Sequence, residues 1–423
     1  MEILFVSAHL PSPRARQAGQ KISYYLCQYL AERHTLHLLS FANAAESESG
    51  RNEGWHIFAS HKVVPITTVR RLLGIVLEPG LPAPVAARSQ PNFCRDLRST
   101  LQSNQFDVVI LDHMAMWQYA ELVTSGALRA GIAHDVLSEL WARKAENHHS
   151  IRGIGARREA RRLQNWERNV ARKLDLICSF SDKDSQQLAN HAEHVPRCIL
   201  QPWFARPSEG SLSDAVREPN SIVFSGAFDR RENVDAVAFA MDEILPRVAA
   251  AAPRYSFHLA GGSIGRLSRQ VARDPRARLA GYVSDLPDFL SRMQIALLPL
   301  REGAGIKIKV LECMAAGLAV VTTPVGAEGI PGQAGVHFFV GRTAEELARH
   351  TILLLRNPTL CARIGKCAQE FIRDNYDFER SARDFEWTLM QRLSQRQFRA
   401  RRTGVLASRD EPGPCAPCQG SGH

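Results

Sequence analysis

A glycine loop between two short apolar strands is the feature that most restricts the fold of this chain. The strands are expected at Ile295–Leu298 and Leu318–Thr323, and between them lie Gly303, Gly305 and a helical segment that ends at Gly317. A strand, a glycine loop and a helix in this order are typical of α/β sheets. The loop brings free backbone N–H groups and the positive end of the helix dipole together, which favours an anion.

Three charged side chains of this segment predict a nucleotide site. Lys307 and Lys309 lie at the start of the helix, where cations oppose the helix dipole and a diphosphate would compensate for them. Glu312 follows Lys309 by three residues on the same helix face, where a carboxylate can accept both hydrogen bonds of a ribose diol. Each feature alone has an ordinary explanation, as a turn or a solvated glutamate. Their combination predicts nucleotide binding.

Strand–loop–helix units recur along the chain and predict two doubly wound, Rossmann-like α/β domains. The first opens with a strand at Glu2–Ser7, a loop containing Gly19 and a helix at Gln20–Arg33. The second opens at Ser221 with a strand that ends at Gly226. We expect the boundaries to divide the chain into a first domain at 1–204, a linker at 205–220 and a second domain at 221–377.

Two histidines of the first domain are alternative candidates for the active-site histidine. The apolar run at 106–111 predicts a buried strand, and Asp112 and His113 follow it directly. His134 follows the next strand, Gly131–Ala133. Open α/β sheets bind ligands at the carboxyl ends of their strands, although this position also suits an ordinary hydrogen-bonded loop histidine. Position therefore leaves His113 and His134 both open.

We expect no metal and no other cofactor. The two aspartates in the DKD sequence at 182–184 fit the cap and the first turn of a helix better than a metal site. Cys415, Cys418 and His423 could ligate zinc, but a fourth ligand is missing from the tail. A basic, disordered tail at 397–423 is the simpler interpretation.

Composition limits the class of protein and its partners. The chain has 423 residues, 45% of them hydrophobic and 23% charged, which is typical of a soluble globular protein. The N-terminus does not resemble a secretory signal, and the cysteines have no disulfide spacing, so we expect a cytoplasmic protein. The net charge of +10, concentrated in Arg143–Lys173 and beyond Arg392, allows phosphorylated substrates, an anionic membrane or nucleic acid as partners.

The segment 299–317 and the following VVTTPVGAEGI at 320–330 together resemble the donor-binding signature of retaining GT-B glycosyltransferases, family 4, also called glycosyl transferases group 1. The resemblance is strong from about Ser221 to Ile330. Members commonly carry two glutamates eight residues apart. Glu312 matches the second, and Ala304 stands in place of the first, as in a polysaccharide-associated sub-branch with a Gly-x-Gly-x-Lys-x-Lys loop.

The resemblance implies an acceptor domain and a donor domain that face one another across a cleft, with a helix at 378–396 returning to the first domain. It implies transfer of a sugar, with retention, from a nucleotide-sugar donor to a sugar or lipid-linked acceptor in polysaccharide or glycolipid biosynthesis. Peripheral contact with the inner face of an anionic membrane is a further expectation. The residues implied are His113 for catalysis and, for donor binding, Gly19, Gly226, Gly303, Gly305, Lys307, Lys309 and Glu312.

Two other classes of protein remain open at this point. A nucleotide-sugar epimerase-type enzyme can share the double-Rossmann architecture, and it would act without an acceptor. A basic nucleic-acid-binding protein is suggested by charge alone, and it would leave the helix of Glu312 unexplained.

Overall fold

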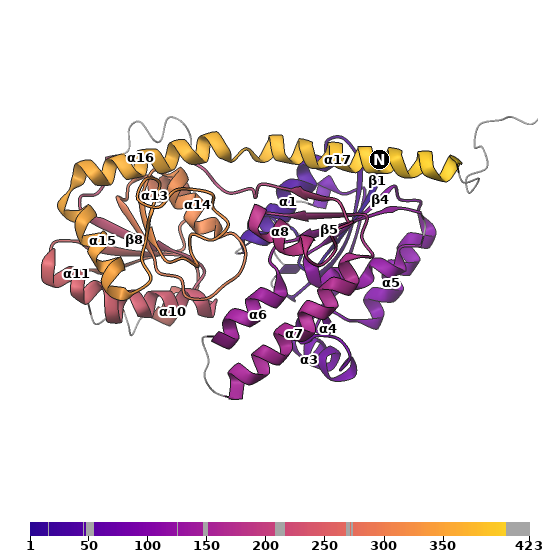
Figure 1. The fold of residues 1–423 in the computed structure, drawn as a ribbon, viewed down its shortest axis with the longest axis horizontal. Coiled ribbons are helices and arrows are strands. Elements are labelled where there is room, and N and C mark those ends of the chain that lie inside the picture. Colours follow the sequence, from indigo (N-terminus) through magenta and orange to yellow (C-terminus); the bar gives the residue numbers. More distant parts are fainter. Residues whose placement is uncertain are drawn as a thin grey trace, which may run out of the picture.

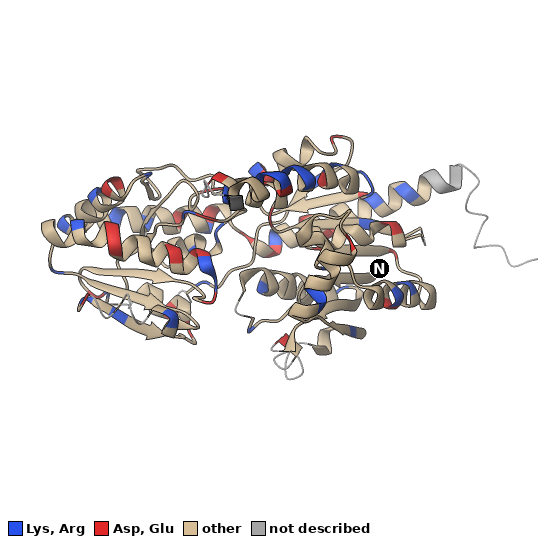
Figure 2. Ribbon diagram, turned by 90° about the horizontal axis from the view of Figure 1, so that it is seen from below, with Lys and Arg blue, Asp and Glu red and all other residues tan. Residues whose placement is uncertain are grey.

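The computed structural model describes residues 1–15, 17–44, 46–47, 55–124, 126–146, 151–207, 216–267, 271 and 274–402. Two parallel sheets form two α/β domains that lie side by side (Figure 1), as the alternating pattern predicts. The cysteine-containing end of the tail, with Cys415 and Cys418, lies outside the described residues, as does half of the expected linker, 208–215. Lys and Arg, like Asp and Glu, are spread over both domains (Figure 2).

The first sheet consists, in sheet order, of β3 (Ser60–Pro65), β2 (Thr35–Ala42), β1 (Glu2–Ser7), β4 (Val108–Asp112), β5 (Leu128–Ala133), β6 (Leu176–Ser179) and β7 (Arg197–Ile199). Its strands pair in parallel. The helices of this domain are α1 (Ala18–Ala31), α3 (Thr68–Leu77), α4 (Ala83–Ala86), α5 (Pro91–Ser103), α6 (Leu137–Glu146), α7 (Ile151–Ala171) and α8 (Asp182–Ala189). Every residue of β4 is buried, as expected for a strand covered on both faces.

The second sheet consists of β10 (Ala277–Gly281), β9 (Ser256–Ala260), β8 (Ser221–Ser225), β11 (Ile295–Leu298), β12 (Ala319–Thr322) and β13 (Phe339–Val340). Its pairings are parallel as well. The helices are α10 (Arg231–Phe239), α11 (Leu245–Ala251), α13 (Leu286–Ser291), α14 (Ile308–Ala315), α15 (Ala344–Arg356) and α16 (Pro358–Asn375), and α17 (Phe378–Arg402) follows.

The apolar periodicity at 234–245 predicts a single helix, but in the structure this helix is interrupted. The α-helical part ends at Phe239, a π-helical turn covers Ala240–Ile244, and α11 continues from Leu245. Pro246 is the physical cause, because proline lacks the N–H that a regular helix would use and its ring crowds the preceding turn. The apolar residues at 336–339 predict a further strand, which the structure places at Phe339–Val340.

The strand orders place a topological switch point in each sheet. In the first sheet it lies between β1 and β4, and in the second between β8 and β11. Loops at the carboxyl ends of such strands diverge in opposite directions and leave a crevice that commonly binds ligands. His113 follows β4, and the glycine loop at 299–307 follows β11, so the predicted site residues come from both switch points.

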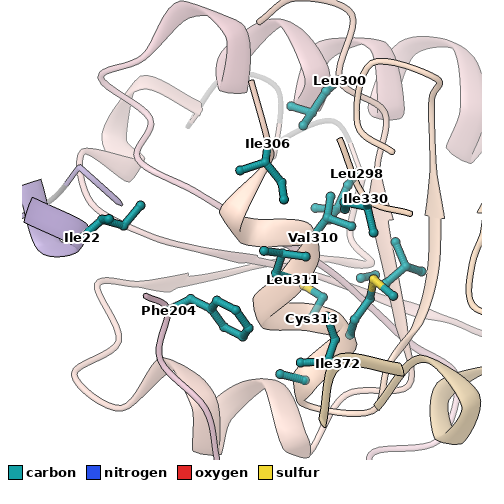
Figure 3. Close-up of a cluster of buried hydrophobic side chains, with 14 of the residues drawn as sticks. Ile22, Phe204, Leu298, Leu300, Ile306, Val310, Leu311, Cys313, Ile330 and Ile372 are labelled. Atoms are coloured by element: carbon teal, nitrogen blue, oxygen red, sulfur yellow. The ribbon is translucent and has the colours of Figure 1, made fainter. Parts of the chain in front are cut away.

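Contacts between the domains are extensive. Ile22 of α1 and Phe204 of the connecting stretch belong to the same buried cluster as Leu311 of α14 (Figure 3). The ring of Trp203 stacks on Tyr25 of α1 with centroids 3.6 Å apart. The chain therefore crosses between the domains over a packed surface.

The long last helix returns to the first domain. Helix α17 runs along that domain (Figure 1) and contacts α1, β5 and β7. Glu386 of α17 accepts hydrogen bonds from the Tyr29 hydroxyl, at 3.0 Å, and pairs with the His34 ring at 2.7 Å. Arg396 donates to the carbonyl of Ala127 at 2.9 Å. The end of the chain thus covers a surface formed near its beginning.

Candidate active site between the two sheets

The glycine loop after β11 requires backbone conformations that favour glycine. Gly303 has a φ of 126° and Gly305 a φ of 65°. A Cβ at Gly305 would lie 2.2 Å from Oδ1 of Asp135, so only glycine allows the first domain to approach this closely. The loop ends at Lys307, whose side chain does not cap α14. The N-terminus of α14, which follows this loop, therefore lies at the boundary between the domains.

Lys309 lies in the first turn of α14 and points to the carboxyl end of β8. Its ammonium group donates to Oδ1 of Asn233 and lies 5.1 Å from the centre of the Phe224 ring. A Cβ at Gly226 would lie 3.0 Å from Nζ of Lys309, so the missing side chain keeps this cation accessible. Burial lowers the pKa of Lys309 to about 8. A partly desolvated cation of this kind gains from an anionic partner.

The side chain of Lys307, in contrast, makes hydrogen bonds within the glycine loop that precedes α14. Its ammonium group donates to the carbonyls of Ala304 and Gly305, at 3.1 and 2.5 Å, and lies 3.6 Å from Oε2 of Glu328. Burial lowers the pKa of Lys307, while the charges of Glu328 and Asp135 oppose that shift. The two lysines expected at one diphosphate thus lie in different surroundings, and contact of Lys307 with a diphosphate stays a prediction.

Glu312 lies one turn after Lys309 and faces the first domain. Burial raises its pKa to about 7, and the positive charges of Lys21 in α1 and of Lys309 oppose the shift. Its carboxylate accepts no hydrogen bond from any residue that the structure describes. A half-buried carboxylate without donors is prepared to accept hydrogen bonds from a ligand.

Asp112 anchors the two histidines of the first domain. Its carboxylate accepts hydrogen bonds from the hydroxyls of Ser7 and Ser23, both at 2.8 Å. It pairs with Nδ1 of His113 at 3.1 Å and with Nε2 of His134 at 2.7 Å. Burial alone would raise the pKa of Asp112, but the charges of the two histidines and their hydrogen bonds hold it well below its usual range. The aspartate therefore stays ionised and fixes both rings.

The two histidines form a stacked pair. Their ring centroids lie 3.7 Å apart with an angle of 6° between the planes. His113 has a φ of 69°, an uncommon value for a residue with a side chain, and such values cluster at functional sites. The structure thus places His113 and His134 next to one another, so both belong to the same candidate site.

The N-terminus of α1 connects the histidine pair with the second domain. A Cβ at Gly19 would lie 3.0 Å from Nδ1 of His134 and 3.4 Å from Nε2 of His113. Two residues further along α1, Lys21 acts on Glu312 of α14. The first turn of α1 therefore lies close to the histidine pair through Gly19 and close to Glu312 through Lys21.

A third histidine joins the site, and the sequence analysis missed it. The His9 ring lies 5.5 Å from that of His113, edge to face. Nδ1 of His9 pairs with Glu46 at 3.0 Å, and Arg88 lies 2.9 Å from Nε2. Burial lowers the pKa of His9 to about 4, so the ring is neutral and can accept from Arg88 while it donates to Glu46. Its position directly after β1, at the switch point, was the available signal.

Charged groups also connect the domains beside the glycine loop. Arg143 of α6 donates to the carbonyl of Gly303 at 2.6 Å and pairs with Glu328. Lys183 of α8 lies 2.7 Å from the same glutamate. Burial opposes ionisation of Glu328, but Arg143 and Lys183 hold its pKa at about 2. This cluster holds the glycine loop of the second domain against the first domain.

Within the described residues, one group has the spacing of metal ligands, namely Asp112, His113 and His134. Each ring nitrogen that faces Asp112 is already paired with that carboxylate. The histidine pair is therefore explained by hydrogen bonding to an ionised aspartate.

Comparison with known proteins gives a family match within the second domain and a fold for the whole chain. Residues 219–357 match the family described as Glycosyl transferases group 1. The structure resembles that of HepE from Anabaena in complex with UDP, with 15% identity, coverage of 92% of this chain and 100% of that chain, and a TM-score of 0.66. At this identity the likeness shows the GT-B fold.

Further similarities agree with these. A sucrose-phosphate synthase from Thermosynechococcus elongatus has 14% identity over 93% of this chain and 100% of that chain, with a TM-score of 0.70. An uncharacterized 44.6 kDa protein in the cps region of Klebsiella pneumoniae is 26% identical over 165 residues, or 37% of this chain. The match spans 42% of the Klebsiella protein, less than half of its length.

Proposed function

We propose that this chain transfers a sugar, with retention, from a nucleotide-sugar donor to a sugar or lipid-linked acceptor. The match to Glycosyl transferases group 1 and the GT-B fold both support a glycosyltransferase. Similar structures support the donor class, because HepE was determined with UDP and with UDP-glucose. A TarM mutant of S. aureus, with a TM-score of 0.66, was determined with UDP and a GlcNAc-glycerol. The Klebsiella relative from a cps region supports a role in polysaccharide synthesis.

The observation that carries the proposal is the pairing of Glu312 and Lys309 at the switch point of the second sheet. Glu312 would accept the hydrogen bonds of the ribose diol, since it is a carboxylate without protein donors. Lys309 and the first N–H groups of α14 would bind the diphosphate beside Gly226. The donor sugar would then extend toward the space in front of Gly19 and the histidine pair.

Glycosyl transfer breaks the bond between the anomeric carbon and the diphosphate oxygen and forms a bond from that carbon to a hydroxyl oxygen of the acceptor, whose proton passes to the departing diphosphate. Positive charge develops on the sugar and extra negative charge on the leaving diphosphate. Lys309 and the dipole of α14 would stabilise that negative charge, because preorganised charges act strongly where water is excluded. We propose that they take the place of a divalent ion. His113, oriented by ionised Asp112, would hold the donor sugar or assist the leaving group.

A thermal-shift screen tests the donor site. Full-length protein is mixed with UDP-, GDP-, ADP- and dTDP-sugars and with the matching free nucleotides. A ligand at a hundredfold excess over its Kd adds about 2.7 kcal/mol to stability. We expect one nucleotide series to stabilise the protein, and a negative result with every nucleotide would refute the proposal. Conversion of the donor sugar to its epimer without any acceptor would favour the epimerase alternative.

The stabilising nucleotide sugar then tests metal independence. Turnover at saturating donor is measured with and without EDTA, and we expect equal rates. A requirement for a divalent ion would contradict the role given to Lys309.

A further inference from the structure

Helix α3 exposes every large apolar side chain that it carries. Among them, Leu72 is 58% exposed and Val76 and Leu77 are each 72% exposed. The only buried residue of the helix is Gly74, and a Cβ at that position would lie 2.3 Å from the carbonyl oxygen of Ala86 in α4. The helix therefore packs on the domain through its glycine backbone, which turns the apolar side chains outward. The exposed set is Val69, Leu72, Leu73, Ile75, Val76 and Leu77.

A basic helix lies beside this apolar surface. Arg162 of α7 donates to the carbonyl of Leu81 at 2.7 Å, just beyond the end of α3. Glu159 of α7 turns inward and accepts from the backbone N–H of Ala83, so its charge is not presented to solvent. Figure 1 shows α3 and the neighbouring part of α7 at the same edge of the first domain. The residues of α7 exposed there are Ile154, Arg157, Arg158 and Arg161.

We propose that α3 and the adjacent basic side of α7 dock the protein on an anionic lipid bilayer. Isolated exposed apolar residues are normal, but a whole apolar helix face marks a site of association. Apolar side chains beside arginines suit the boundary between acyl chains and anionic headgroups. No helix within the described residues is long and apolar enough to cross a bilayer, so docking would be at the surface. The inference does not depend on the transfer reaction.

The docking helix is connected with the histidine side of the active site. Burial, and next to it the charge of Arg71 on α3, lowers the pKa of Arg88 to about 10. Arg88 lies 2.9 Å from the His9 ring, which in turn packs edge to face on His113. A bilayer bound at α3 would therefore lie on the first-domain side of the site. This placement suits an acceptor carried by the membrane.

Vesicle binding of the full-length protein tests the proposal without any donor. Sedimentation with mixed phosphatidylcholine–phosphatidylglycerol vesicles should show binding that weakens with salt and is much lower with pure phosphatidylcholine. The double variant Leu72→Glu, Val76→Glu should reduce partitioning by at least about tenfold, because two apolar side chains become charged. Both positions are exposed, so thermal unfolding should remain that of the wild type.

The matched control carries the same changes on another helix. Trp387 and Met390 are 60% and 48% exposed and belong to α17, which runs along the edge of the first domain opposite α3 (Figure 1). Trp387→Glu with Met390→Glu should leave vesicle binding unchanged. In a separate variant, Arg157→Gln with Arg158→Gln should reduce the preference for phosphatidylglycerol.

Three results would overturn the proposal. One is absence of binding to the anionic vesicles, and another is equal binding by wild type and the α3 variant. The third is a dimer in sedimentation velocity that the α3 changes dissolve while vesicles are not bound, which would assign the surface to a second copy of the chain.

Discussion

Replacing Glu312 with glutamine is expected to stabilise the fold and to weaken donor binding. Burial raises the pKa of Glu312 from an ordinary value of 4.5 to about 7. The folded protein thus binds this proton more tightly than the unfolded chain, and its free energy of unfolding falls as the pH rises from about 4.5 to about 7. Each unit of pKa shift corresponds to about 1.4 kcal/mol. Because the carboxylate is partly solvated, we expect glutamine to recover about 1–3 kcal/mol at pH 8 and nothing at pH 4.

The same substitution removes a charged acceptor from the proposed ribose site. A hydrogen bond to a charged group contributes about 1.5–3 kcal/mol, which corresponds to a rise in Kd of roughly 10- to 150-fold. The ionised form is the better acceptor, so the donor affinity of the wild type should increase as the pH rises toward about 7. The variant has no such proton and should show a nearly constant Kd over that range.

Urea unfolding at pH 4 and pH 8 measures the first effect, and calorimetric titration with UDP and UDP-sugars measures the second. Glu302→Gln is the matched control, because this glutamate lies in the glycine loop just before α14 and its substitution should change neither quantity. An unchanged Kd for the nucleotides that bind would refute the ribose assignment even if the fold were stabilised. Equal stability of variant and wild type at pH 8 would refute the burial argument.

Two further predictions separate the parts of the site. Lys309→Ala should weaken UDP binding at least about tenfold and leave uridine binding nearly unchanged, since the lysine would act on the diphosphate; equal losses in paired titrations would mean that it supports the fold. His113→Ala should keep the donor Kd near that of the wild type while turnover falls, about 10²- to 10⁴-fold if the ring transfers a proton. A loss of donor affinity as large as the loss of turnover would contradict this division between the domains.

The fold could be predicted because its signals are local. Continuous apolar strands such as β4 and β11, each followed by a loop and a helix, specify parallel sheets covered on both faces. The glycines, Lys309 and Glu312 lie within ten residues on one loop and helix. Their shared location at the edge of β11 needed no knowledge of the rest of the chain.

The remainder of the site depends on pairs that are distant in sequence. Arg88 meets His9 across 79 positions, and Arg143 meets Glu328 across 185. No local pattern predicts such partners. Lys307 and Lys309 show a different limit, because Lys307 ends the loop with an extended backbone, whereas Lys309 lies in the first turn of α14. The exposure of α3 could not be predicted from the sequence either, since its apolar residues have the spacing that normally marks the buried side of a helix.

The return of α17 to the first domain has a consequence for the order of folding. The surface of α1 that Glu386 covers is translated before the second domain, but α17, which covers it, is translated after the second domain. The first domain must therefore wait, with Tyr29 and His34 uncovered, until the second domain has been translated. Completion of the first domain is tied to completion of the second, so a chain interrupted between them would present an unfinished surface to chaperones and proteases.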